Sequence, residues 1–439
     1  MASTYLSRTP STGVNRRTFT FSAWIKKSST DSAVRRLIEL YNASTYYVSF
    51  RFRDDSSSRL DFYSESNGAG VNLRTNRSFR DLSAWYHIVL SVDTTLATAD
   101  DRMKMYVNGV QETSFALRTN PSLNENLNFN NSGNGQYIAR AVGTETDRMF
   151  DGSMTHIHFI DGLAYDADTF GETDATTGIW KPKTAPSVTY GTNGFFLKGE
   201  NSGALGTDSS GNANNFTVNG TPTQTIDTPS NVFATLNPLA NNIVTLSDGN
   251  TKLTNGTVDF KGSISTLAPT IGKWYFETYI GALGNSSQIG IVDITQYLLA
   301  TENYPGNPTR GYSYDQVGNV YNNATSSAYG STFTTADIIG VAFDLENNKV
   351  YFSINGTWQN SADPASNTGG YSITGGYEYT PSISSNNGNV SINFGNGYFG
   401  TTAVASATTD ESGLGIFEYT VPTGYYALCT KNINEQEYS

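Results

Sequence analysis

Histidine is the first residue type to weigh for chemistry, and the chain holds three: His87, His156 and His158. The last two are two residues apart, so in a strand they share one face, which is a spacing that two metal ligands could use. The surrounding run FDGSMTHIHFIDG alternates as a strand does, and no cysteine or third histidine stands beside them. We therefore interpret the pair as part of an ordinary strand. A Ser-His-Asp triad is compatible with the composition, but no Gly-x-Ser-x-Gly turn marks a nucleophile.

Paired carboxylates could hydrolyse a glycosidic bond, which requires two acids about 5 to 10 Å apart. A pattern known from glucanases that carry their acids along one strand is Glu-x-Asp-x-x-Glu, and the chain contains no such run. Its nearest acidic groups are Asp54-Asp55, Asp100-Asp101 and Glu411, all in turn-like stretches. Solvated loops explain them, so we predict no enzymatic activity.

Calcium is the one metal to consider, because carboxylates are the hard oxygen ligands that it prefers. The candidates by residue type are Asp93, Asp100, Asp101 and Asp151. No EF-hand-like loop contains them, and their spacing alone is weak evidence. We predict no resident cofactor, with Ca²⁺ at these acids as the alternative.

Aromatic side chains are the remaining signal for recognition. A tyrosine offers an apolar face to a sugar ring or a peptide and a hydroxyl for specificity. Tyrosine is also favoured in strands, so part of any such set belongs to the core. We expect the binding residues on Tyr-rich loops of the C-terminal half, and the candidates are Tyr297, Tyr304, Tyr312, Tyr314 and Trp358.

The elements that would position these residues are strands. Residues 338–359, IIGVAFDLENNKVYFSINGTWQ, alternate between apolar and polar side chains on both sides of a polar break. Asn355-Gly356 then supplies the positive φ angles of a two-residue turn, which predicts a three-stranded meander. A similar unit runs from Ile88 to Asn108-Gly109, so the chain uses one kind of β unit twice.

Composition and length extend this pattern to the whole chain. Its 439 residues are too many for one ordinary core, and abundant Gly (42), Tyr (27) and Phe (23) with only 15% charged residues are typical of an all-β protein. We predict two antiparallel β-sandwich domains at residues 1–185 and 241–400. An extended connector rich in Gly, Asn, Ser and Thr occupies residues 186–240, and a tail with a docking strand occupies 401–439.

Charge and segment composition exclude several classes of partner. A net charge of −12 and a pI near 4.7 argue against nucleic-acid binding, which needs a concentrated basic surface. The single cysteine, Cys429, cannot form an intrachain disulfide. No apolar run has the length of a signal peptide or of a membrane span, so we expect folding in a cytoplasm without membrane insertion.

Short motifs in each half resemble known families. FSAWI (21–25), WYH (85–87), MYVNG (105–109) and FDG (150–152) resemble laminin-G-like, concanavalin A-type domains. GKWYFE (272–277), Asp344, the Asn355-Gly356 turn and NFG (393–395) resemble a SPRY domain. The second resemblance implies a bent β-sandwich that binds partners through loops at one end and has no enzymatic activity.

The order of the parts resembles structural proteins of marine tailed bacteriophages. A laminin-G-like half, the run DSSGNANNFT, a SPRY-like half and the ending GYYALCTKNINE follow one another. The resemblance implies a virion protein, either a fibre or adhesin or a capsid-decorating protein. Its partners would be other virion proteins and host-surface glycans, and it would form a homo-oligomer. The alternatives are a glycan depolymerase that uses the N-terminal sandwich and a purely architectural role.

Overall fold

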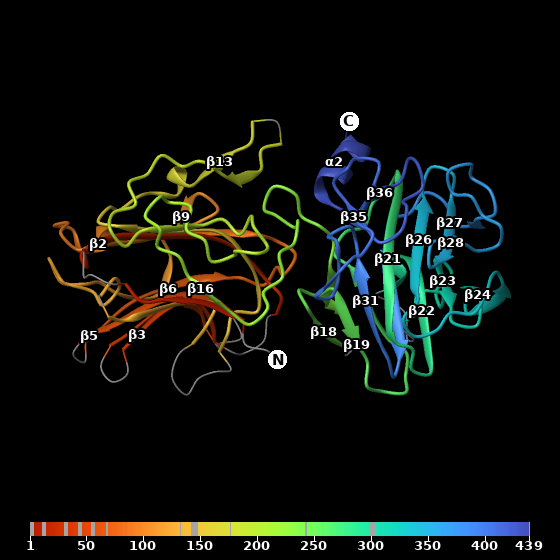
Figure 1. Ribbon diagram of the computed structural model, residues 1–439, viewed down its shortest axis with the longest axis horizontal. Coiled ribbons are helices and arrows are strands. Elements are labelled where there is room, and N and C mark those ends of the chain that lie inside the picture. Colours follow the sequence, from red (N-terminus) through yellow and green to blue (C-terminus); the bar gives the residue numbers. More distant parts are fainter. Residues whose placement is uncertain are drawn as a thin grey trace. The chain divides into compact units, whose positions relative to one another are not determined.

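The computed structural model divides the chain into two compact units, Met1–Gln224 and Thr225–Ser439, each built almost entirely from strands (Figure 1). The boundary lies inside the predicted connector. The structure describes residues 4–10, 15–29, 34–42, 46–53, 58–66, 69–131, 133–141, 148–175, 177–241, 244–297 and 304–438.

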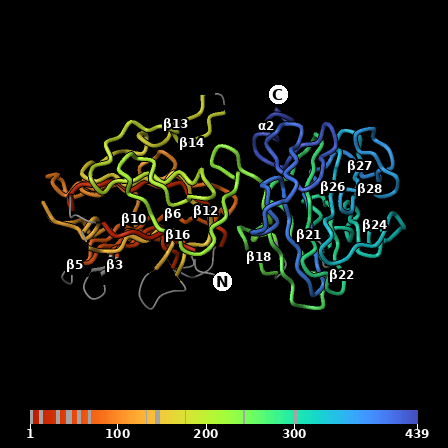
Figure 2. The backbone as a smooth tube through the Cα atoms, viewed as in Figure 1, coloured from red at the N-terminus to blue at the C-terminus, as the bar shows by residue number. Residues whose placement is uncertain are grey.

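The N-terminal unit is a sandwich of two antiparallel sheets (Figure 2). The eight-stranded sheet has the order β10 (Phe115–Thr119), β6 (Ala69–Ser78), β5 (Arg59–Ser66), β4 (Tyr46–Phe52), β3 (Arg35–Asn42), β11 (Gly135–Ile138), β1 (Tyr5–Arg8), β16 (Thr217–Asn219). The six-stranded sheet has the order β15 (Phe195–Leu197), β12 (Gly152–Asp161), β2 (Thr18–Lys27), β7 (Tyr86–Asp93), β8 (Met103–Val107), β9 (Val110–Gln111). Two short 3-10 helices, η1 (Ala99–Asp101) and η2 (Ala167–Thr169), lie between strands.

Alternation along β2 decides which side chains enter this core. Phe19, Phe21 and Ile25 point inward and pack with the apolar side chains of β7 and of the larger sheet. Trp24 points to the opposite face, as the period of two requires. That outer face is covered by a second, smaller cluster around Phe170, next to the hairpin of β13 (Gly171–Thr173) and β14 (Trp180–Pro182).

The C-terminal unit is also a sandwich of two large sheets. The seven-stranded sheet has the order β17 (Leu236–Asn241), β20 (Lys261–Ser265), β30 (Tyr379–Asn386), β22 (Ser286–Asp293), β23 (Gly311–Asp315), β24 (Asn319–Asn322), β25 (Thr325–Ala328). The nine-stranded sheet has the order β18 (Thr245–Ser247), β19 (Lys252–Thr254), β31 (Asn389–Asn393), β21 (Lys273–Ala282), β26 (Ile338–Asp344), β27 (Lys349–Ile354), β28 (Thr357–Trp358), with β29 (Tyr371–Ser372) on β27 and β36 (Tyr426–Ala427) on β21. Smaller elements are α1 (Ile294–Tyr297), the pair β32 (Tyr398–Phe399) and β33 (Thr402–Ala403), the pair β34 (Thr408–Thr409) and β35 (Ile416–Phe417), and α2 (Thr430–Tyr438).

The two predicted meanders are confirmed. In the C-terminal unit β26, β27 and β28 follow one another in antiparallel pairing, and Asn355 and Gly356 have φ angles of 48° and 78°. In the N-terminal unit β7, β8 and β9 do the same, with φ angles of 49° at Asn108 and 82° at Gly109. Positive φ at both turn residues matches the twist of the flanking strands, which is why this dipeptide fixes the register.

The predicted connector at residues 186–240 is not a separate segment. Its strands β15 and β16 complete the sheets of the N-terminal unit, and β17 belongs to the C-terminal unit. Several of its phenylalanines are buried in the N-terminal core, and polar bonds add to that burial: the Asp208 carboxylate accepts N–H groups of Phe196 at 2.8 Å and Ser210 at 2.8 Å. The few bulky apolar residues of this segment are therefore enough to anchor it in the core, and its asparagine and aspartate side chains hold the turns between them.

The C-terminal tail covers the outer face of the nine-stranded sheet. Phe417, Val421 and Tyr425 pack against Tyr275 and Tyr351, whose rings point away from the main core. Strand β36 runs parallel to β21 and fixes the position of the tail. None of the helices in the described part of the chain is long and apolar enough to cross a membrane.

Candidate binding groove

Four of the five predicted binding residues lie in the interior of the C-terminal unit. Tyr312 and Tyr314 are on β23 and belong to the main core, where they are 3% and 0% exposed. Tyr297 ends helix α1 and packs on Ile264, and Tyr304 is 9% exposed. The expectation that these rings project from exposed loops is wrong. Side chains two apart on β23 share one face, and that face is turned toward the other sheet.

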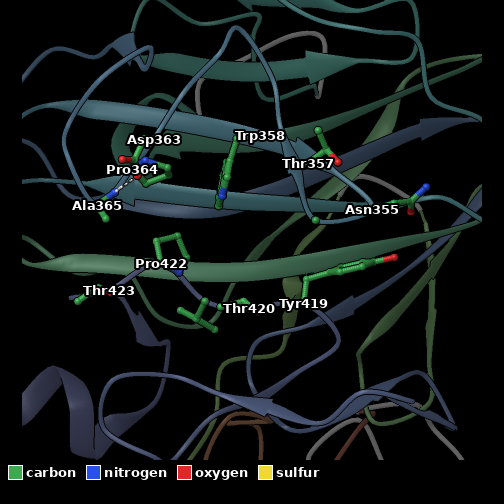
Figure 3. A pocket seen from close by; sticks show the side chains of 12 residues that line it. Asn355, Thr357, Trp358, Asp363, Pro364, Ala365, Tyr419, Thr420, Pro422 and Thr423 are labelled. Carbon is green, nitrogen blue, oxygen red and sulfur yellow. Dashed lines mark hydrogen bonds between the residues drawn. The ribbon is translucent and has the colours of Figure 1, made fainter.

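Trp358 has a different environment. Its ring is half-buried and lines a groove of about 450 Å³ on the C-terminal unit (Figure 3). One wall comes from the end of the meander and the loop after it, and the other comes from the C-terminal tail. The residues that line this groove, which we call the Trp358 groove, are Asn355, Gly356, Thr357, Trp358, Asp363, Pro364, Ala365, Tyr419, Thr420, Val421, Pro422 and Thr423.

The first wall is held by the meander turn and by the aromatic cluster on the outer face of the nine-stranded sheet. Trp358 is the second residue after the Asn355-Gly356 turn, and its ring meets those of Tyr275 and Tyr351 edge to face at 6.3 and 6.5 Å. Pro364 accepts a hydrogen bond on its carbonyl from the Tyr425 hydroxyl at 3.4 Å. A fixed ring and a proline give this wall little conformational freedom to lose on binding.

The second wall is attached through the buried carboxylate of Glu277. This carboxylate accepts the backbone N–H groups of Glu418 at 2.8 Å and Tyr419 at 2.9 Å, and the Tyr275 hydroxyl donates to it at 3.0 Å. Burial raises the pKa of Glu277 to about 7, although these donors act in the opposite direction. A Cβ atom on Gly356 would lie only 2.6 Å from Cδ1 of the Tyr419 ring. The two walls therefore meet at a glycine.

Asp363 is the carboxylate on the rim of the groove. It is exposed, and it accepts the N–H of Ala365 at 3.1 Å and the hydroxyl of Ser366 at 2.7 Å. The hydrogen bond from Ser366 lowers the pKa of Asp363. The groove therefore combines an aromatic ring, two prolines, threonine hydroxyls and one ionised carboxylate. This arrangement can bind a ligand, but it does not pair a nucleophile with a general base.

The N-terminal unit contains a serine next to a histidine, and the geometry opposes catalysis. Trp180 Nε1 donates to His87 Nδ1 at 3.1 Å, and an indole nitrogen is a donor only. The other ring nitrogen of the neutral imidazole then carries the proton, so Nε2 donates to Ser22 Oγ at 2.9 Å. Burial lowers the pKa of His87 to about 3. This histidine cannot accept a proton from Ser22.

The His156 and His158 side chains do not form a metal pair. A β-bulge separates Thr155 from His158, and His156 has a φ angle of 46°, so the simple alternation fails there. His158 stacks on Phe196 with ring centroids 3.9 Å apart. Within the ranges that the structure describes, no cluster of three or more His, Cys, Asp or Glu side chains could hold a metal ion.

The calcium candidates in the described residues form no cluster that could hold a metal ion, and three of them are engaged in local contacts. The Asp93 carboxylate accepts a hydrogen bond from the backbone N–H of Thr95 at 2.9 Å. Asp100 forms an ion pair with Arg118 at 3.1 Å, and Asp101 forms one with Lys104 at 3.4 Å. Asp151 is exposed before β12. Asp54 and Asp55 lie outside the described residues.

One family model matches part of the N-terminal half of the chain, and another matches part of the C-terminal half. Residues 2–168 match the concanavalin A-like lectin/glucanases superfamily, and residues 273–396 match the SPRY domain. A Ran-binding proteins 9/10 homolog of Drosophila melanogaster is 30% identical over 99 residues, which are 21% of this chain and 10% of that protein. Ran-binding protein 9 of Danio rerio is 32% identical over 87 residues, 19% of this chain and 14% of that protein. The chain thus spans only a small fraction of the length of these relatives.

Two solved structures are similar at low identity. A human SPRY domain is 17% identical with a TM-score of 0.28, covering 35% of this chain and 95% of that one. The heptameric SAP-like pentraxin of Limulus polyphemus is 16% identical with a TM-score of 0.28, covering 37% of this chain and 72% of that one. On the family matches, the chain carries an N-terminal laminin-G-like domain of the concanavalin A-like superfamily and a C-terminal SPRY domain.

Proposed function

We propose that this chain is a non-enzymatic structural protein of a tailed-bacteriophage virion, a fibre or adhesin or a capsid-decorating protein. Its C-terminal unit would bind a host-surface glycan or another virion protein through the Trp358 groove. The observation that carries the binding role is the half-exposed Trp358 ring on the wall that contains Pro364, across the groove from the wall that contains Pro422. The virion assignment is supported by the order of motifs along the whole chain.

The arrangement of the groove favours recognition rather than structure alone. Large aromatic rings bury much apolar area and are enriched at binding surfaces when part of the ring stays accessible. Apart from the short strand β28, both walls are turns and loops on a rigid sandwich, which is where binding residues can vary without unfolding the scaffold. The groove volume of about 450 Å³ also falls within the usual range of about 300 to 1,000 Å³ for ligand sites.

A binding assay tests this function. It measures how the full chain attaches to intact host cells and to purified virions that lack this protein. Trp358→Ala should abolish attachment, whereas Tyr438→Ala, which removes an exposed ring on α2, should leave it unchanged. Circular dichroism of both variants would verify that they fold. Attachment that survives Trp358→Ala would overturn the proposed role of the groove.

Two further measurements test the virion assignment and the competing enzymatic function. Antibody against the chain, viewed on intact virions by electron microscopy, should label the tail or the capsid, and unlabelled particles would contradict a virion role. A glycan depolymerase would instead release reducing sugar from host polysaccharide. We expect no release above that of buffer.

A further inference from the structure

We infer that the occupant of the Trp358 groove is an arginine-bearing segment of a partner protein, with the guanidinium stacked on the Trp358 ring beside the Asp363 carboxylate. This inference rests on the proposed binding role of the groove and names the chemistry of its ligand. It assigns the groove to protein recognition rather than to glycan recognition.

The charge of the groove is the first argument. Between Lys349 and Lys431 the sequence contains no Lys, Arg or His, and every residue that lines the groove falls in this stretch. The charged groups at or next to the walls are acidic: Asp363 on one wall, and Glu411 and Glu418 beside the other. A basic partner therefore gains favourable electrostatic energy there, and an acidic one does not.

The carboxylate of Asp363 is suited to a charged donor. Its two local bonds, from Ala365 N and Ser366 Oγ, engage one oxygen each and leave further lone pairs toward solvent. A guanidinium presents planar paired donors that match a carboxylate, which an ammonium or a sugar hydroxyl does not. This favours arginine over lysine.

The ring of Trp358 supplies the second contact. Tryptophan is the best aromatic partner of a cation, and arginine stacks on aromatic faces more often than lysine does. Figure 3 shows Asp363 and Pro364 on one side of this ring, and the indole nitrogen directed toward the wall that carries Thr420 and Pro422. Among the described residues none accepts a hydrogen bond from this indole N–H. A peptide carbonyl is an acceptor of the kind required.

A peptide array probed with the full chain tests the inference. The array holds short peptides with one fixed Arg between randomised neutral residues, and matched sets with Lys, Gln or Glu at the fixed position. The Arg set should bind most tightly, and Gln should weaken binding at least about tenfold, as expected for loss of a desolvated cation–π pair and its ion pair. Binding of the Arg set should fall as salt is raised.

Variants of the chain locate the contacts. Trp358→Ala should remove binding of the Arg set, and Asp363→Asn should weaken it and flatten its dependence on salt. The matched controls are Tyr438→Ala for a ring and Glu378→Gln for a carboxylate, both exposed residues outside the groove. Denaturation midpoints show whether each variant is folded.

The possible outcomes separate this inference from the proposed function. Equal binding of the Arg and Gln sets, or Arg binding that Asp363→Asn does not alter, overturns the inference. Binding of a neutral oligosaccharide that requires Trp358, without binding of the Arg set, also overturns it and leaves the proposed function standing. If no peptide or oligosaccharide binds and Trp358→Ala leaves virion and host attachment intact, both are wrong.

Discussion

Replacement of Tyr314 by Ala tests whether the tyrosines of β23 belong to the core. The Tyr314 ring is fully buried and stacks on Phe352 with ring centroids 5.4 Å apart. It also contacts Tyr329 at 6.0 Å and Phe333 at 5.9 Å. Its hydroxyl donates to the carbonyl of Ser331, so both ends of the side chain are occupied inside the protein.

The magnitude follows from these contacts. Truncation of a buried aromatic ring to Ala costs about 3 to 5 kcal/mol, and loss of the hydrogen bond adds about 1 kcal/mol. The free energy of unfolding of a domain is typically only about 5 to 15 kcal/mol. The C-terminal unit of this variant would therefore be close to unfolding. Tyr314→Phe keeps the ring and should cost only about 1 kcal/mol.

Denaturant titration of the full chain measures this effect. Because the chain has two compact units, fluorescence and circular dichroism should show whether one transition moves while the other stays. We expect a large fall in one midpoint for Tyr314→Ala, a small fall for Tyr314→Phe and none for Tyr438→Ala. An unchanged midpoint for Tyr314→Ala together with weaker partner binding would refute the placement of this ring in the core.

Three further predictions concern buried groups. Burial raises the pKa of Glu277 from 4.5 to about 7, so the folded state holds this proton more tightly and stability should fall as pH rises through that window. Glu277→Gln should remove this fall in stability with pH. If the denaturation midpoints of variant and wild type fell equally as pH rises, the prediction would be contradicted. The thiol of Cys429 is fully buried, so reductant should not change the melting temperature, and a shift would reveal an intermolecular disulfide. Because His87 donates to Ser22, a fluorophosphonate probe should leave Ser22 unlabelled, and labelling detected by mass spectrometry would overturn the tautomer assignment.

The sequence by itself determined the strands and their hairpins. Alternation in residues 338–359 and the Asn355-Gly356 turn act within a few residues, so neither depends on distant partners. The same period of two puts Phe19 and Trp24 on opposite faces of β2. The motif order was also sufficient to distinguish a laminin-G-like half from a SPRY half.

Tertiary structure alone decided which aromatic rings are accessible. Alternation shows that Tyr312 and Tyr314 share a face, but whether that face meets solvent depends on the sheet packed against it. The Trp358 groove likewise joins residues 355–365 with residues 419–423, and the carboxylate of Glu277 on a third segment holds the second wall. No local pattern encodes such a juxtaposition, because it arises only when the tail covers the outer face of the nine-stranded sheet.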